Sequence, residues 1–440
     1  AATASAQQQQ QQQRSGCDAP TPAPSPGGGR SASRLLVLNA GSSSLKFKAF
    51  TLGGDGRVSL TIGGVLERIG DPDHSVLSAK ADAVGTSPEA KWKLPVRAAD
   101  HVAAMTAILD FLAEHVSPGM ATEVVAVGHR VVHGLDINQP VLLDEGVLAT
   151  IEKAKVLAPL HNSAALQGIA AAGKVFKGTP QVAVFDTAFH ATMPPAAYMY
   201  GLPYELYTEH HIRRYGFHGT SHSYLVEQAA GMLGKPREEV NVITCHLGNG
   251  CSVAAVCGGA CVDTSMGMTP LEGLVMGTRC GDVDPAVVLH IQKELGLSVE
   301  DADALLNRKS GLLGLCGDND MRGVVSAADG GSERAQLALK MFVYRIRKYI
   351  GAYLAVLGGT VDALVFSAGI GENNMRIRAM VCDGLEPLGI ALDAAANEAA
   401  MGVQADVSAG GGRARTRVLV IPTNEELSIA QQTLRVVAAS

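Results

Sequence analysis

The sequence predicts an α/β protein with two related domains, and three observations support this. Short Val/Ile/Leu-rich runs alternate with helix-periodic segments along the chain. The stretches 35–49 and 241–256 share one plan, an apolar strand, a polar Gly/Asn turn and a second strand. A third Gly-rich segment, VFSAGIGENN at 365–374, also follows an apolar run. Three glycine turns after strands favour a nucleotide bound in a cleft between the domains.

Composition limits the class of protein. With 440 residues, of which 47% are hydrophobic, the chain is long enough for two domains that each have a core. A net charge of −6 argues against a nucleic-acid surface, and no run of eighteen apolar residues predicts a membrane span. The eight cysteines lie mostly in apolar runs without the CxxC spacing of a zinc site. We expect them to be reduced and buried in a non-secreted protein.

The first 33 residues differ from the rest of the chain. They consist largely of Ala, Gln, Ser, Pro and Gly, which predicts disorder. The segment is Ser-rich and nearly free of acidic residues, and it resembles an organellar transit peptide. This predicts a chloroplast or mitochondrial location, whereas a low-complexity tail without targeting function would leave the protein cytoplasmic.

Seven apolar runs are typical of buried strands, at 35–39, 124–128, 181–186, 241–246, 252–256, 362–367 and 417–422. Helical periodicity predicts helices at 101–115, 222–233 and 333–357. The last of these helices should stop at Gly358 and Gly359.

The stretch LVLNAGSSSLKFKAF at 35–49 ends in an alternating Leu/Lys/Phe/Lys pattern, which favours a hairpin over the strand-to-helix plan of a P-loop. The turn supplies polar donors from Asn39 and Ser42 to Ser44, and Gly41 lets the backbone bend. Lys46 adds a positive charge. Either a phosphate-binding turn or a plain polar turn is compatible with these residues.

The middle of the chain places polar residues inside apolar surroundings. Each cluster by itself is more often structural, as a hydrogen-bonded core histidine or a helix cap. Together they supply what phosphoryl transfer needs, cations for the phosphoryl oxygens and carboxylates that hold Mg²⁺. The candidates are His129, Arg130, His133, His161, Asp186, His190, Arg213, Arg214, His218, His222, Arg279, Asp282 and Asp284.

Nine strings between residues 35 and 430 resemble the acetate kinases in order and content. They are NAGSSSLKF, GHRVVHG, APLHN, FDTAFH, RRYGFHGTSH, HLGNG, DTSMGMTPLEGLVMGTR, AGIGEN and IPTNEELSIA. The resemblance implies two ribonuclease H-like domains flanking a nucleotide cleft, and a homodimer. It also implies reversible, direct in-line phosphoryl transfer from ATP to acetate with Mg²⁺, for which Mn²⁺ substitutes. We expect an N-terminal domain at 34–188, joined by a C-terminal helix at 427–440, and a nucleotide-binding domain at 189–426.

Matching the strings assigns roles to individual residues. By similarity, Asp186, His218 and Arg279 are catalytic, and Asn39 and Glu425 help place the metal. Ser42, Ser44 and Lys46 lie near the terminal phosphates. The acetate site comprises Arg130, Val132, Leu160, His161, Phe217 and Pro270. The ATP-binding set comprises Lys46, His246, Leu247, Gly248, Asn249, Gly250, Asp320, Met321, Arg322, Gly369, Ile370, Gly371, Glu372 and Asn373, with Arg378 on the nucleoside side.

Some positions depart from the family pattern. Ser163 replaces a common Pro, Cys280 and Cys316 replace Ser, and the GDNDMR segment is one residue short before Asp320. The short segment leaves the nucleoside contacts open, and Cys280 beside Arg279 raises a redox hypothesis against a buried, inert thiol. Two other functions are compatible with parts of the sequence, a propionate or butyrate kinase and a non-catalytic actin- or chaperone-like nucleotide switch.

Overall fold

The computed structural model describes residues 33–54, 56–82, 89–412 and 414–440. Residues 33–440 form one compact unit that contains two β-sheets. The disorder and targeting predicted for 1–33 fall outside the described residues, apart from Ser33. The predicted domain boundaries at 188 and 426 stay predictions.

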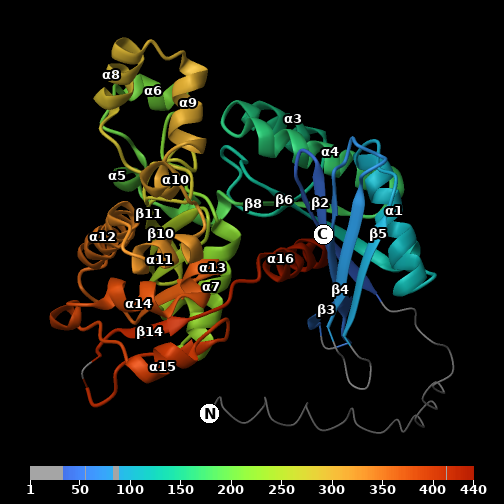
Figure 1. The fold of residues 1–440 in the computed structure, drawn as a ribbon. Helices are drawn as coiled ribbons and strands as arrows, with labels where there is room; N and C mark the ends of the chain where they lie inside the picture. Colours follow the sequence, from blue (N-terminus) through green and yellow to red (C-terminus); the bar gives the residue numbers. More distant parts are fainter. Residues whose placement is uncertain (1–32, 55, 83–88, 413) are drawn as a thin grey trace, which may run out of the picture. The chain divides into compact units, whose positions relative to one another are not determined.

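The first sheet has eight strands in the order β5-β4-β3-β2-β1-β6-β8-β7 (Figure 1). Strand β1 pairs antiparallel with β2 and parallel with β6, and β6 is parallel to β8. The strands are β1 (Arg34–Ala40), β2 (Ser44–Leu52), β3 (Val58–Glu67), β4 (Val76–Ala81), β5 (Ala90–Pro95), β6 (Val124–Val131), β7 (Val141–Leu142) and β8 (Gln181–Phe185).

The second sheet has six strands in the order β11-β10-β9-β12-β14-β13. They are β9 (Val242–Leu247), β10 (Cys251–Cys257), β11 (Ala260–Thr264), β12 (Ala363–Ser367), β13 (Ala405–Asp406) and β14 (Arg417–Val420). Strand β9 is antiparallel to β10 and parallel to β12, which is parallel to β14. Thus β11-β10-β9-β12-β14 repeats β3-β2-β1-β6-β8 in order and direction, which confirms the predicted internal repeat and both hairpins.

The helices lie between and after these strands. They are α1 (His101–His115), α2 (Met120–Glu123), α3 (Glu145–Lys153), α4 (Pro159–Val175), α5 (Pro195–Tyr198), α6 (Tyr204–Thr208), α7 (Gly219–Leu233), α8 (Pro285–Leu295), α9 (Val299–Arg308), α10 (Gly311–Cys316), α11 (Met321–Asp329), α12 (Glu333–Val356), α13 (Ala368–Asn373), α14 (Met375–Cys382), α15 (Ala394–Ala399) and α16 (Glu425–Ala439). Short 3₁₀ turns occur at Ala154–Val156, Ala188–Thr192, Arg237–Glu239 and Glu386–Leu388. The three predicted helices are confirmed, with α7 beginning three residues early.

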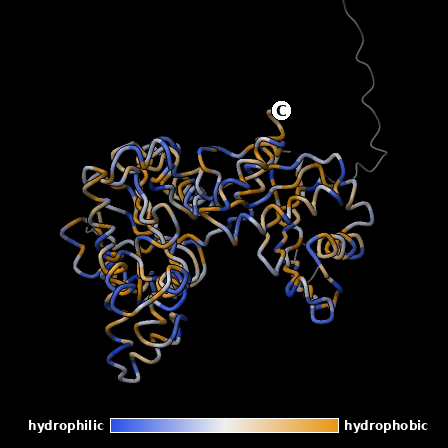
Figure 2. Tube along the Cα trace, turned by 90° about the horizontal axis from the view of Figure 1, so that it is seen from above, coloured by the Kyte–Doolittle hydropathy of each residue, from blue (hydrophilic) through white to orange (hydrophobic). Residues whose placement is uncertain are grey.

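Helix α16 packs against the first sheet although it follows the second in sequence (Figure 1). Its Ile429 and Ala430 join a buried cluster with Leu35, Val37 and Val182. Short hydrophobic and hydrophilic stretches alternate along the Cα trace (Figure 2). No helix in the described ranges has the length and apolar character needed to cross a bilayer.

Six strands escaped sequence reasoning, namely β3, β4, β5, β7, β11 and β13. Strand β3 contains Gly63 and Gly64, which weaken a strand prediction. The glycine at 64 is required by close packing, because a Cβ there would lie 2.5 Å from the Ser78 carbonyl oxygen and 2.8 Å from the Phe47 ring. The expected burial of the cysteines is confirmed for Cys245, Cys251, Cys261 and Cys382, whereas Cys280 and Cys316 are half-buried and Cys257 is exposed where β10 ends.

Candidate active site

An ion pair with a buried carboxylate and a partly buried guanidinium joins the ends of two parallel strands. Arg130 lies near the end of β6, and Asp186 directly follows β8. Because β6 and β8 are parallel neighbours, their carboxyl ends meet at one edge of the sheet. Arg130 Nε donates to Asp186 Oδ1 at 3.0 Å and Nη2 donates to Oδ2 at 2.7 Å. Nη1 of Arg130 makes no hydrogen bond within the described residues, so it is available for another anion.

Glu425, the first residue of α16, lies beside this pair. Its Oε2 is 3.9 Å from Arg130 Nε. Burial raises the pKa of the Glu425 carboxyl, and Asp186 raises it further, against the opposing charges of Arg130 and Lys46. Asn39 pairs with Lys46 across the first hairpin. The predicted metal residues Asn39 and Glu425 therefore belong to the same region as Asp186 and Lys46.

His218 is held against Asp186 by an unusual backbone. It precedes α7 with a φ of 58°, in the left-handed region that non-glycine residues rarely adopt. The following Gly219 donates its N–H to the Asp186 carbonyl oxygen at 2.9 Å. A Cβ at Gly219 would lie 2.2 Å from that oxygen, so only glycine fits here. The left-handed residue and the close contact fix the start of α7 on the end of β8.

His218 and Arg279 face the second hairpin turn together. A Cβ placed on Gly250 would lie 3.4 Å from Arg279 Nη1 and 3.6 Å from His218 Nε2. Arg279 Nη1 also donates to the Pro270 carbonyl oxygen at 3.1 Å. Burial lowers the pKa of His218 well below its usual value, and it lowers that of Arg279. A neutral imidazole and a guanidinium thus converge on one point.

His161 completes this group from the start of α4. Partial desolvation lowers the pKa of the His161 imidazole, and the charges of Arg130 and Arg279 lower it further. His161 therefore lies within electrostatic range of both guanidinium groups. The structure brings together the predicted residues Arg130, His161, Asp186, His218 and Arg279.

The predicted apolar pocket is less uniform. Phe217 is buried at 2% exposure, whereas Leu160 is exposed at 58%. Val132 is half-buried against the core of the second sheet, and Pro270 is half-buried. The four predicted residues therefore differ in burial, from the buried Phe217 to the exposed Leu160.

A separate cavity of about 540 Å³ contains most of the predicted nucleoside residues. Its lining is Gly248, Asn249, Asn319, Asp320, Met321, Arg322, Gly369, Ile370, Asn373 and Asn374. Sequence reasoning assigned no role to Asn319 or Asn374, although Asn319 lies inside the quoted segment GDNDMR and Asn374 ends the quoted segment VFSAGIGENN. Arg322 Nη2 bonds Asp320 Oδ2 at 2.5 Å, and this interaction lowers the pKa of Asp320 to about 2.

Some predicted ATP-binding residues lie outside that lining. His246, Leu247, Gly250, Gly371 and Glu372 are absent from it. Glu372 Oε1 accepts the Thr423 N–H at 3.0 Å, so the side chain braces the chain before α16. Ser42 lines a different cavity, with His101 and Gln167, rather than the nucleoside cavity.

The placement of Arg378 on the nucleoside side is wrong. Its side chain is fully buried at 0% exposure. The guanidinium donates to Asn397 Oδ1 and to four backbone carbonyls, of Gly371, Glu372, Asn397 and Ala400. These bonds use all five guanidinium donors. Arg378 holds the Gly-rich segment from behind and has no donor left for a ligand.

Several other candidates from the central clusters are structural. Arg214 Nη2 pairs with Glu272 at 2.6 Å, and Arg213 stacks on the Tyr198 ring at 3.7 Å. Asp282 accepts the Gly273 N–H, and Asp284 caps α8. Some of the polar residues that cluster in the sequence therefore stabilise the fold, and others form the site.

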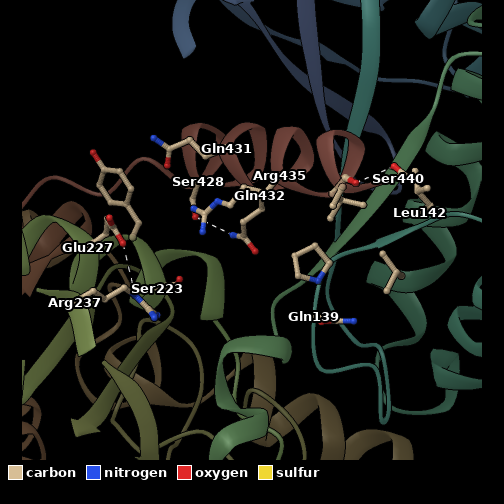
Figure 3. Close-up of a pocket in the computed structure, with 15 residues that line it drawn as sticks. Gln139, Leu142, Ser223, Glu227, Arg237, Ser428, Gln431, Gln432, Arg435 and Ser440 are labelled. Carbon is tan, nitrogen blue, oxygen red and sulfur yellow. Dashed lines mark hydrogen bonds and ion pairs between the residues drawn. The ribbon is translucent and has the colours of Figure 1, made fainter. Parts of the chain in front are cut away.

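A larger cavity of about 570 Å³ lies between α7, α16 and the β7 segment (Figure 3). Glu227 and Arg237 form an ion pair of 3.6 Å in its wall, and Gln432 donates to Ser428 (Figure 3). This cavity contains none of the predicted site residues, so a choice of site by cavity volume alone would have missed the catalytic cluster.

Proteins named acetate kinase and propionate kinase are similar to this chain. A model described as the Acetokinase family matches residues 34–431. A relative named acetate kinase from Oleidesulfovibrio alaskensis is 49% identical over 91% of this chain and 99% of its own. The crystal structure of Porphyromonas gingivalis acetate kinase is 41% identical, with a TM-score of 0.84 over 92% of this chain and 100% of that one. A propionate kinase structure from Francisella tularensis is also 41% identical, with a TM-score of 0.82 over 92% and 99%.

These structural likenesses confirm the expected fold, an α/β arrangement of two ribonuclease H-like domains. Together with the matched family model and the near-complete coverage of the relatives, they establish that the chain belongs to the acetokinase family.

Proposed function

We propose that this protein is an acetate kinase, which reversibly transfers the terminal phosphoryl group of ATP to acetate to give acetyl phosphate and ADP. The observation that carries the proposal is the convergence of His218 Nε2 and Arg279 Nη1 on Gly250, in the turn that leads to the nucleoside cavity. The similar proteins named acetate kinase support acetate as the acceptor.

The geometry suits direct transfer between two anions. Acetate and triphosphate repel each other, so the site must supply positive charge and alignment. The free Nη1 of Arg130 suits the acetate carboxylate, while Nε and Nη2 stay bound to Asp186. His218 and Arg279 face the position of the phosphoryl oxygens. Holding the reacting oxygens in line removes roughly 7–11 kcal/mol of the barrier.

Magnesium enters this scheme as part of the MgATP substrate. Mg²⁺ prefers one or two carboxylates together with substrate phosphates and water, rather than a complete protein cage. Within the described residues no cluster of three His, Cys, Asp or Glu side chains forms such a cage. Glu425 and Asn39, with Asp186 nearby, are the hard oxygen donors that would hold it, and Mn²⁺ accepts the same donors. The ion would neutralise charge on the transferring phosphate.

The decisive experiment is a hydroxamate assay for acetyl phosphate with MgATP and acetate. Acyl phosphate formation supports the proposal. Its absence at high enzyme concentration, with a folded protein, would reject the enzyme in favour of a nucleotide switch.

A propionate or butyrate kinase is the second candidate, supported by the similar protein named propionate kinase. One methylene in an apolar pocket is worth only ~1–3 kcal/mol, and the exposed Leu160 leaves room for a longer chain. Comparing kcat/KM for acetate, propionate and butyrate decides between these acceptors.

Two further properties belong to the proposal. A homodimer is proposed from the resemblance to acetate kinases, and light scattering of the purified protein measures it. An organellar location is proposed from the Ser-rich, acid-poor first 33 residues. Fusing residues 1–40 to a fluorescent protein tests the location, and a diffuse cytoplasmic signal would contradict it.

A further inference from the structure

Three side chains form a hydrogen-bonded series behind His218. Its Nδ1 lies 2.9 Å from Ser252 Oγ, which lies 2.7 Å from His222 Nε2. His222 Nδ1 lies 2.7 Å from Thr244 Oγ1. Ser252, His222 and Thr244 are all fully buried, at 0% exposure. They come from β10, α7 and β9, so the series crosses three elements of the second sheet and its covering helix.

Only one direction of this series gives every proton between these side chains an acceptor, with the His218 Nε2–H left facing the site. If Thr244 donates to His222 Nδ1, then His222 Nε2–H donates to Ser252, and Ser252 donates to His218 Nδ1. In the reverse direction the Thr244 hydroxyl proton has no acceptor within the described residues. A buried unsatisfied donor costs free energy, which disfavours that arrangement.

The two directions differ in whether His218 Nε2, which faces the site, carries the ring proton. In the satisfied direction His218 Nδ1 accepts, so the ring proton sits on Nε2, the atom that faces Gly250 beside Arg279 Nη1. In the reverse direction Nε2 would present a lone pair to an anion. A donor at this position stabilises phosphoryl oxygens, whereas a lone pair repels them.

We propose that Ser252, His222 and Thr244 are positioning residues that set the tautomer of His218, so that it acts as a neutral Nε2–H donor to the transferring phosphoryl group. The identity of the acceptor rests on the proposed kinase function. The tautomer does not, because it follows from the hydrogen bonds alone.

The surroundings of His218 favour the neutral form. Burial lowers the pKa of His218 and of His222 well below the usual value, and neighbouring histidines and arginines lower that of His218 further. The His246 ring stacks on His218 with centroids 4.2 Å apart, and Arg130 and Arg279 are the cations in range. The stacked ring also limits rotation of the His218 imidazole.

Nitrogen NMR of the ¹⁵N-histidine-labelled protein tests the tautomer without requiring activity. His218 is assigned from the signal lost in His218→Asn. At pH 7.5 we expect a protonated Nε2 and an unprotonated Nδ1, and a mixture of tautomers in Ser252→Ala. A proton on Nδ1 of the wild type, or protons on both nitrogens, would overturn the inference.

Steady-state kinetics test the consequence. Ser252→Ala and Thr244→Val should lower kcat by roughly 10- to 100-fold, with the KM for acetate within about twofold. The matched control is Thr264→Val, because this buried hydroxyl donates to the Val253 carbonyl oxygen outside the series. An unchanged kcat in folded Ser252→Ala, or an equal loss in the control, would contradict the role.

The two proposals fail in different ways. If the wild type forms no acetyl phosphate, the proposed function fails, while the NMR measurement still decides the tautomer. If Ser252→Ala does not fold, the wild-type NMR spectrum still tests the tautomer, and the kcat of Thr244→Val still tests its effect on catalysis.

Discussion

Arg130→Ala should destabilise the protein as well as weaken acetate binding. Asp186 is 1% exposed, and its two carboxylate oxygens receive Arg130 Nη2 and Nε at 2.7 and 3.0 Å. Removing the arginine leaves a buried carboxylate with its ionic partner gone. Breaking a buried ion pair in this way costs about 3–5 kcal/mol of the free energy of unfolding.

The same substitution removes the free Nη1 that suits the acetate carboxylate. We therefore expect a higher KM for acetate together with a lower kcat, because Asp186 loses its orientation. Urea unfolding at pH 7.5 measures the stability, and the hydroxamate assay measures the kinetics.

The double variant Arg130→Ala/Asp186→Asn is the control for the buried charge. It replaces the unpaired carboxylate with a neutral amide of similar shape, so it should recover a large part of the lost stability. If the double variant is no more stable than Arg130→Ala, the ion pair is not what the substitution breaks.

Three other predictions follow from the site and its surroundings. Arg279→Ala should lower kcat by about 10²–10³-fold with a small change in acetate KM, because Nη1 faces the phosphoryl position, and equal turnover would contradict this role. Burial lowers the pKa of His129 and of His246 to about 4, against about 6.5 in unfolded chains. Between pH 6.5 and 4 the unfolded state therefore binds more protons than the folded state, so the free energy of unfolding should decrease as the pH falls. Urea unfolding measures this decrease, and it should be smaller in His129→Gln. Cys280 is half-buried and burial raises the pKa of its thiol, so Cys280→Ser should lose activity under mild oxidant as fast as the wild type; protection in the variant would revive the redox hypothesis.

Local patterns in the sequence located most strands of the two sheet cores but only three of the helices. Apolar runs and helical periodicity located seven core strands and three helices. A buried strand or helix places its apolar residues in a continuous run or at a regular spacing along the sequence. The repeated hairpin plan indicated duplication, and the matching strand orders of the two sheets confirm it. Strand β5 was missed although Lys91, Trp92, Lys93 and Leu94 alternate with period two, because none of its residues is buried and it contains no continuous apolar run.

Tertiary structure decided which polar residues act together. No local rule places Arg130 on Asp186, because the pair is formed by parallel pairing of β6 with β8, and 56 positions separate the two residues. Arg378 reads as a cation near a Gly-rich segment, yet its neighbours in space consume all its donors. The series behind His218 likewise exists only because β9, β10 and α7 pack together. The sequence thus determined which acidic, basic and hydroxyl groups are present. Long-range packing determined which of these groups contact one another and how each is oriented.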